Sequence, residues 1–390
     1  MKYLLTFFLT LITSTILFAQ SKKVPVFISG QDGYKSFRIP AIVSMPDGEL
    51  LAFCEGRVNG VDDFGNIQIV LRRSKDHGKT WSPLQVVANN GGLQAGNSAP
   101  VVDLTDPAYP HGRVFLFYNT GNAHEGDVRK GNGLREVWYK TSADGGKTWS
   151  DAVNITTQVH RPHQPTINPA YNFSEDWRSY ANTPGHAIQF HDGRYRGRIF
   201  VAANHSAGPP QKSFMDYRAH GFYTDDHGKT FHLSTTVEAP GGNESTAAEL
   251  TGDRLMMNSR NQKGQPRCRI VSVSGNGGRT WDSTWYDPTL PDPVNEGSLL
   301  SIGKRKGRTI LAFSNTADTS KRDDLTLRIS YDEGRSWPQQ FVVDRSPSGA
   351  IHGFTGYSDL VQVGKRKIGV LYEKEEYSQI VYTVIGFSYL

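Results

Sequence analysis

The sequence predicts an all-β fold in which repeated blades form a propeller. Three observations predict it: an eight-residue phrase recurs five times, short strand-like runs flank several copies, and no segment shows a sustained helical period. Repeats spaced by several tens of residues are typical of propeller blades. The chain has 390 residues, 37% of them hydrophobic, and no low-complexity tract, so we expect it to bury a large core.

The first twenty residues differ from the rest. Lys2 is followed by an apolar run that ends near Ala19, which is typical of a secretory signal peptide. The run is short and is interrupted by threonine and serine, which favours cleavage over a membrane anchor. We therefore expect residues 1–20 to be removed, the protein to be exported to the periplasm or secreted without stable membrane insertion, and residues 21–390 to form one domain.

Charge, cysteine and histidine content exclude several classes. The chain has 43 Lys and Arg against 38 Asp and Glu, with no long block of like charge, so nucleic acid is not an expected partner. Cys54 and Cys268 are too few for a disulfide framework or a structural zinc site, and the sequence leaves open whether they pair. His160 and His163 flank a proline and have no convergent carboxylates, so no metal or other cofactor is expected.

The recurring phrase reads Ser/Thr-x-Asp-x-Gly-x-Thr/Ser-aromatic. Its copies are residues 74–81, 142–149, 224–231, 274–281 and 330–337. Their starts are 68, 82, 50 and 56 residues apart, and the fourth copy has Asn276 in place of Asp. In a turn, the Asp accepts hydrogen bonds from backbone amides and the Gly takes the positive φ. Because five copies cannot all face one site, we predict structural hairpin turns and not catalytic or metal-binding groups.

Further motifs connect these turns to a known family. Phe37-Arg38-Ile39-Pro40, the five turns and Tyr357-Ser358-Asp359-Leu360 together resemble the exo-α-sialidases (neuraminidases) of the glycoside hydrolases, whose repeats are called Asp boxes. The resemblance extends from Arg38 to Glu373. It implies a six-bladed β-propeller with its site at the centre of one face, so that one blade lacks an Asp box. It also implies terminal sialic acid of glycans as the substrate, and no cofactor.

The substrate explains why arginines matter. Sialic acid carries a carboxylate on its anomeric carbon, and a planar guanidinium binds a carboxylate through two hydrogen bonds. The resemblance implies three such arginines: Arg38 in the first motif, Arg260 in Asn-Ser-Arg, and Arg322 in Lys-Arg-Asp-Asp-Leu. Arg328, six residues further on, is the rival for the third position. A lone arginine is more often a solvated surface group, but the motif around Arg38 favours the binding role.

An acid/base is expected in the loop of residues 55–66. The resemblance implies an Asp there that protonates the leaving oxygen, and the register of the following strand favours Asp63 over Asp62. Arg57 resembles the family arginine that lines the same part of the pocket. Asn97 is expected to contact the sugar.

The nucleophile implied by the resemblance is a tyrosine, an exception to the two-carboxylate scheme of glycosidases. A neutral phenol approaches the substrate's carboxylate without repulsion, but with a pKa of about 10 it needs a base beside it. Tyr357 matches the family tyrosine and Glu244 its partner. Glu249 is the runner-up for that partner, or else an acid that supports the site or the structure. Glu373 resembles the acid that orients Arg38.

Two other functions remain open at this point. A trans-sialidase or intramolecular trans-sialidase would use the same scaffold and differ in its acceptor site or pocket shape. A non-catalytic propeller lectin would bind sialosides, but it would be free to lose the Tyr, Glu and Asp residues that are present here.

Overall fold

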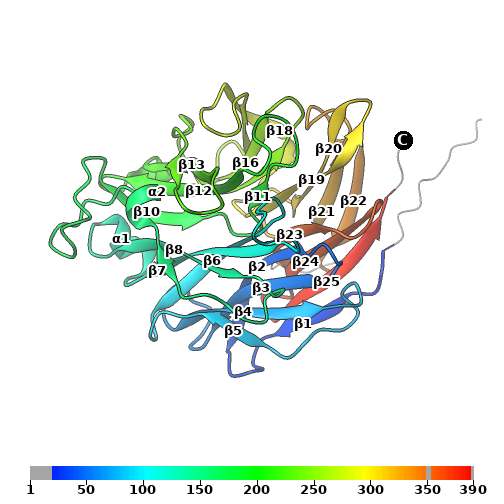
Figure 1. The fold of residues 1–390 in the computed structure, drawn as a ribbon, viewed down its shortest axis with the longest axis horizontal. Helices are drawn as coiled ribbons and strands as arrows, with labels where there is room; N and C mark the ends of the chain where they lie inside the picture. The colour runs from blue at the N-terminus through cyan, green and yellow to red at the C-terminus, as the bar shows by residue number, and fades with distance from the viewer. Residues whose placement is uncertain (1–19, 348–352, 388–390) are drawn as a thin grey trace, which may run out of the picture.

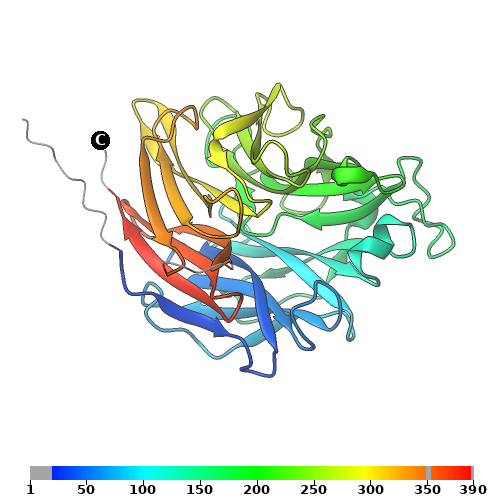
Figure 2. The same cartoon turned by 180° about the vertical axis from the view of Figure 1, so that it is seen from behind.

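The computed structural model describes residues 20–347 and 353–387, most of them in β-strands (Figure 1). The sheets form a ring, and the chain runs once around it until the C-terminal strands lie beside the N-terminal ones (Figure 1, Figure 2). The predicted all-β propeller is confirmed. Residues 1–19, where most of the expected signal peptide falls, lie outside the described residues. Within the described ranges no helix is both long and apolar enough to cross a membrane.

Hydrogen bonding joins the strands into five sheets. The largest contains β2 (Ser36–Ser44), β3 (Leu50–Arg57), β4 (Ile67–Ser74), β5 (Gln85–Ala88), β6 (Gln94–Asp103), β7 (Arg113–Gly121), β8 (Arg135–Ser142) and β9 (Val153–Asn154). The next contains β10 (Trp177–Asn182), β11 (Ile188–Gln189), β12 (Ile199–Ala207), β13 (Tyr217–Thr224) and β14 (His232–Leu233).

Two four-stranded sheets follow, and a third closes the ring. They contain β15 (Gly242–Glu249), β16 (Leu255–Asn261), β17 (Cys268–Ser274) and β18 (Ser283–Pro291), then β19 (Gly297–Arg305), β20 (Arg308–Thr316), β21 (Leu325–Ser330) and β22 (Gln339–Asp344). The closing sheet contains β23 (Thr355–Gln362), β24 (Lys367–Lys374), β25 (Gln379–Gly386) and β1 (Val24–Ile28). The helical segments are α1 (Glu125–Arg129), α2 (Thr156–Val159) and the 3₁₀ turn Lys212–Phe214.

The number of separate blades differs from the expected six. Within the described residues four sheets of four or five strands stand alone as blades, and the remaining eight strands form one sheet. A single parallel bridge, between Ile67 of β4 and Gln94 of β6, joins the two halves of that large sheet. When sheets are defined by hydrogen bonding, the expected six separate blades are therefore not observed. The described residues form four separate blades and one eight-stranded sheet.

The five Asp boxes all form the hairpin that leads to the outer strand of their sheet, as the sequence predicted. In the first, the Asp76 carboxylate accepts from the Lys79 and Thr80 amides at 3.0 and 2.9 Å. The Ser74 hydroxyl accepts from the Gly78 amide at 2.8 Å. The other four copies repeat the bond from the Gly amide to the first Ser or Thr hydroxyl. These side chains are used to close turns and not to build a site.

The closing sheet lacks an Asp box because of its topology. Its order from the axis outward is β23, β24, β25 and β1, so the outer strand comes from the other end of the chain. β1 pairs antiparallel with β25, with Val24 opposite Tyr382. There is consequently no hairpin from the third to the fourth strand that a box could close. This pairing also joins the two ends of the ring.

A buried carboxylate joins the inner strands near the axis. Asp359 of β23 accepts hydrogen bonds from the Ile42 amide at 2.8 Å, from Nδ1 of His186 at 2.7 Å and from the Ser298 hydroxyl at 2.7 Å. Its three partners belong to three different sheets or their connections. Because hydrogen bonds to a charged acceptor are the stronger kind, Asp359 holds the inner strands in register beneath the pocket described next.

Candidate active site

The pairing register of the inner strands shifts where predicted site residues lie. It shifts after Arg38 in β2, around Asn97 in β6, around Glu244 in β15 and around Tyr357 in β23. Ile39 and Asn97 have positive φ angles of 61° and 54°. A bulge turns a side chain out of the alternation of a regular strand, so these bulges direct several polar side chains to one place.

The structure brings eight of the predicted residues to one pocket of about 170 Å³. They are Arg38, Arg57, Asp63, Asn97, Glu244, Arg260, Arg322 and Tyr357. A ninth, Glu373, lies directly behind Arg38.

Tyr357 and Glu244 are in direct contact although 113 residues separate them. The Tyr357 hydroxyl lies 2.7 and 2.8 Å from the two Glu244 carboxylate oxygens, to which it donates. Nη1 of Arg260 donates to the same hydroxyl at 2.7 Å and to Glu244 at 2.6 Å. The phenol therefore has an acceptor ready for its proton and a cation that stabilises the resulting negative charge.

The phenol requires that base. Burial raises the pKa of Tyr357 well above its usual value, and Glu244 raises it further, while Arg260 opposes both. The side chain is 5% exposed. Tyr357 is therefore protonated in the free protein, and a nucleophilic role for its hydroxyl would require Glu244 to take the proton.

Arg38, Arg260 and Arg322 surround the Tyr357 ring. The guanidinium carbons of Arg38 and Arg322 each lie 5.4 Å from the ring centroid. Arg322 donates to the Tyr377 hydroxyl at 3.0 Å, and Arg38 stacks on the Tyr377 ring at 3.8 Å. Three guanidinium groups around one small pocket are chemically suited to bind a carboxylate.

Glu373 orients the first of these arginines. Its carboxylate accepts from Nε of Arg38 at 2.7 Å, from the Ile39 amide at 2.8 Å and from the Tyr357 amide at 3.0 Å. Glu373 is fully buried. The Glu373 carboxylate thus holds the Arg38 guanidinium and the Tyr357 backbone together.

Asp63 lies on a loop above the pocket, with 71% of its side chain exposed. It forms an ion pair with Nη1 of Arg57 at 2.8 Å. Desolvation raises the pKa of Asp63, but the charges of Arg57 and Arg38 lower it more, and the net pKa is below the usual range. The free protein therefore holds Asp63 as a carboxylate, and an acid role requires that a ligand weaken those positive charges.

Two candidates lie elsewhere. Glu249, the runner-up to Glu244, is at the opposite end of β15, where it accepts from the amides of His191 and Asp192 at 2.8 and 3.0 Å. It lies outside the pocket, so of the roles open to it the structural one fits this position, and the role of partner to Tyr357 does not. Arg328 is buried in β21, donates to Asn315 at 2.8 Å and does not line the pocket.

The sequence did not reveal several residues of the pocket. Glu55 is buried and accepts from Arg57 at 2.7 Å and from the Asn97 amide at 2.9 Å, so it joins two predicted residues. Tyr377 lines an adjoining pocket and contacts Arg38 and Arg322 from there. It follows two glutamates in a turn where all three residues have positive φ, a strained conformation that often marks functional sites. Arg135 and Glu125 also line the pocket. No motif marks these four, and only the closed ring brings them together.

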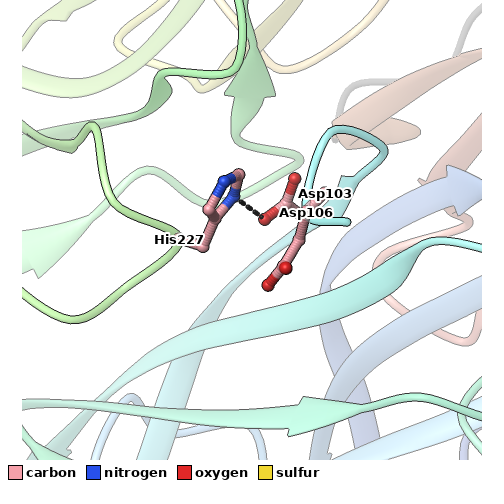
Figure 3. Close-up of side chains that lie close together, drawn as sticks. All are labelled: Asp103, Asp106 and His227. Carbon is pink, nitrogen blue, oxygen red and sulfur yellow. Dashed lines mark hydrogen bonds and ion pairs between the residues drawn. The ribbon is translucent and has the colours of Figure 1, made fainter. Parts of the chain in front are cut away.

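One group outside the pocket has the residue types of a metal site. Potential ligand atoms of Asp103, Asp106 and His227 lie within 4.8 Å of one another (Figure 3). Nδ1 of His227 already contacts Asp103 at 2.8 Å. Nη2 of Arg113 lies 2.8 Å from Asp106 and 4.0 Å from Asp103, so a guanidinium supplies the positive charge here. The group joins the end of β6 to the third Asp box.

The two cysteines do not pair. Cys54 and Cys268 are both buried free thiols, on β3 and β17. Burial raises the pKa of both thiols, which makes them poor nucleophiles.

Several known proteins are similar to this chain in sequence. A family model described as a BNR repeat-like domain matches residues 48–370. The chain is 31% identical over 365 residues to a sialidase of Micromonospora viridifaciens, covering 89% of this chain and 51% of the relative. It is 28% identical to a sialidase of Bacteroides fragilis, and the match covers 88% of this chain and 61% of that relative. It is 29% identical to an exo-alpha-sialidase of Aspergillus fumigatus, and the match covers 88% of this chain and 80% of that relative. The chain thus spans only 51% and 61% of the first two relatives.

Solved structures share the fold. The Hadza microbial sialidase Hz136 superposes with a TM-score of 0.72 at 25% identity, covering 91% of this chain and 66% of that one. The intramolecular trans-sialidase from Ruminococcus gnavus superposes with a TM-score of 0.71 at 17% identity, covering 93% and 97%. The second likeness is one of fold alone.

Proposed function

The chain belongs to the sialidase family of BNR-repeat proteins, and from this premise we propose that it is an exo-α-sialidase. It hydrolyses terminal sialic acid from glycoproteins, glycolipids and oligosaccharides, with net retention at the anomeric carbon. One observation carries the proposal: the Tyr357 hydroxyl lies between Glu244 and Arg260, inside a cluster of three arginines. That arrangement suits a nucleophile beside a bound carboxylate.

In the proposed reaction the three arginines hold the sugar's carboxylate. Tyr357 attacks the anomeric carbon while Glu244 takes its proton, and Asp63 gives a proton to the departing glycosidic oxygen. Asp63 then takes a proton from water, which attacks the same carbon and breaks the bond to Tyr357. Glu244 returns its proton to the phenolate. Two displacements on one carbon give overall retention.

Substrate binding itself prepares Asp63 for the acid role. Arg38 and Arg322 are among the cations that lower the pKa of Asp63 after desolvation has raised it. A bound carboxylate neutralises part of that positive charge. The pKa of Asp63 therefore rises when substrate is bound, in the direction that a proton donor needs.

The remaining expectations are part of the same proposal. The large sheet carries two Asp boxes and is continuous through a single bridge, so we count it as two blades and the propeller as six-bladed. Residues 21–390 form the catalytic domain. Residues 1–20 direct export, after which the protein does not insert into membrane. Sialylated glycans are its partners and nucleic acid is not.

The test is an assay on α2,3-, α2,6- and α2,8-linked sialosides, with the products identified by NMR. We expect free sialic acid, released first as the α-anomer. Transfer to an acceptor sugar, or release of an internally dehydrated sialic acid, would assign a trans-sialidase instead. Binding without any release would assign a lectin.

A further inference from the structure

Arg135, the first residue of β8, is a buried pocket arginine that the proposed mechanism does not use. It is 6% exposed. Its Nη1 donates to the side-chain oxygen of Gln94, and its Nε is buried with no hydrogen-bond partner. Among the residues that the structure describes, no carboxylate forms an ion pair with it, whereas Arg38, Arg57 and Arg260 each have one.

The surroundings of Arg135 do not favour its charge. A buried charge without an ion-pair partner is costly unless other groups compensate it. Burial lowers the pKa of Arg135, and the more distant charge of Glu125 opposes this only in part. Because the Arg135 guanidinium lines a pocket and has an N–H without a partner, a ligand in the pocket can accept a hydrogen bond from it.

The neighbouring strand keeps space for this guanidinium. Gly121 of β7 pairs with Arg135. A Cβ on Gly121 would lie 2.5 Å from Nη1 of Arg135 and 2.9 Å from the side-chain oxygen of Gln94. Any other residue at position 121 would displace both groups, so the backbone is shaped around the pair.

The element that carries Arg135, β8, lies across the ring from elements that carry part of the arginine cluster. Tyr357 comes from β23, and Arg322 from the segment before β21. Figure 1 shows α1, β8 and β10 on the opposite side of the ring from β21 to β25. Because Arg135 lines the same pocket as the arginine cluster, a sugar whose carboxylate the cluster holds would extend toward Arg135.

We propose, on the basis of the proposed function, that Arg135 and Gln94 form a subsite for a neutral oxygen acceptor on the half of the sugar remote from its carboxylate. Hydroxyl and acyl carbonyl oxygens are of this kind. Gln94 orients the guanidinium, which donates to the sugar. A neutral ligand fits better than a second anion because the negative charges of Glu125, Glu55 and Asp63 act on Arg135. Glu125, which accepts from Ser179 at 3.2 Å, adds an acceptor to the same wall.

The test compares Arg135→Met with Arg328→Met. Arg328 is a matched control: it is 2% exposed, its Nη1 donates to the Asn315 side chain, its Nε lacks a partner, and burial lowers its pKa to about 10, yet it does not line the pocket. The readouts are KM and kcat for an aryl sialoside, and the inhibition constant Ki of free sialic acid.

Arg135→Met should raise KM and Ki together by about 10- to 100-fold, the effect of one lost charged hydrogen bond, with kcat changed less than about threefold. Arg328→Met should leave KM and Ki unchanged. The inference is overturned if Arg135→Met leaves Ki unchanged, or if Arg328→Met raises it equally.

Arg135→Lys guards against a folding defect, since it keeps the charge but loses the planar fork. It should still raise Ki several-fold with an unchanged melting temperature. Wild-type Ki in this variant would mean that the charge has only a structural role and would overturn the inference. A wild-type protein that cleaves no sialoside would refute the proposed function instead.

Discussion

Replacing Glu373 with Gln removes one negative charge and changes almost no volume. The two Glu373 oxygens accept four hydrogen bonds: two from Arg38, at 2.7 and 3.4 Å, and one each from the amides of Ile39 and Tyr357, at 2.8 and 3.0 Å. A glutamine has only one oxygen. If that oxygen keeps Nε of Arg38 and the Ile39 amide, the new NH₂ group faces the Tyr357 amide, donor against donor.

The size of the effect follows from burial. An unpaired buried N–H costs about 1–3 kcal/mol. Breaking a buried ion pair by removing one partner costs about 3–5 kcal/mol, and the two terms overlap. We expect Glu373→Gln to lower the free energy of unfolding by about 3–5 kcal/mol. It should also lower kcat/KM by at least about 100-fold, because a displacement of about 1 Å at the reacting groups has that effect.

Urea unfolding followed by circular dichroism measures the first quantity, and steady-state hydrolysis of an aryl sialoside measures the second. Glu375→Gln is the control, because Glu375 is exposed and its carboxylate lies 3.4 Å from Lys374. It should change the free energy of unfolding by less than about 0.5 kcal/mol. If the free energy of unfolding of Glu373→Gln is within about 1 kcal/mol of wild type and its kcat/KM is unchanged, Glu373 does not have this orienting role.

Three further predictions follow from the same geometry. Asp63→Ala should lower kcat/KM by about 10²- to 10⁴-fold on natural sialosides and far less on aryl sialosides, whose leaving groups need little protonation; equal losses would exclude Asp63 as the acid. Glu244→Gln should lower kcat by about 10²- to 10⁴-fold, and by the same factor on natural and on aryl sialosides. A wild-type kcat in this variant would show that Tyr357 needs no base. Burial lowers the pKa of His160, His205 and His220, that of His220 to about 3, so below about pH 6.5 the unfolded chain binds more protons. The free energy of unfolding should then fall as the pH is lowered from about 6.5 toward 3, by up to about 1.4 kcal/mol per pH unit for each of these histidines. His220→Gln should reduce the slope of the free energy of unfolding against pH, and an unchanged slope would contradict this.

Much of the site was predictable because the motifs coincide with bulges of the inner strands. Phe37-Arg38-Ile39-Pro40 contains the irregularity of β2, and Tyr357 occupies that of β23. A motif that fixes a local backbone shape also fixes where its side chain points. Residues in such motifs can therefore be assigned without knowing the rest of the fold.

What the sequence left open or did not reveal also has physical causes. Glu244 and Glu249 lie on the same strand, and only the finished sheet shows which end of β15 faces the pocket. Tyr377 and Arg135 reach the site through a strained turn and through closure of the ring, which no local pattern records. The number of separate sheets depends on one bridge between Ile67 and Gln94. A repeat pattern in the sequence does not predict a single bridge of this kind.

The proposed reaction requires that Tyr357 form a covalent bond to the sugar. Rapid acid quenching during turnover of an aryl sialoside, followed by proteolysis and mass spectrometry, tests it directly. We predict a sialyl adduct on the peptide that contains Tyr357, and none on that peptide in the Tyr357→Phe variant. An adduct on another residue, or a first product of inverted configuration, would contradict the account.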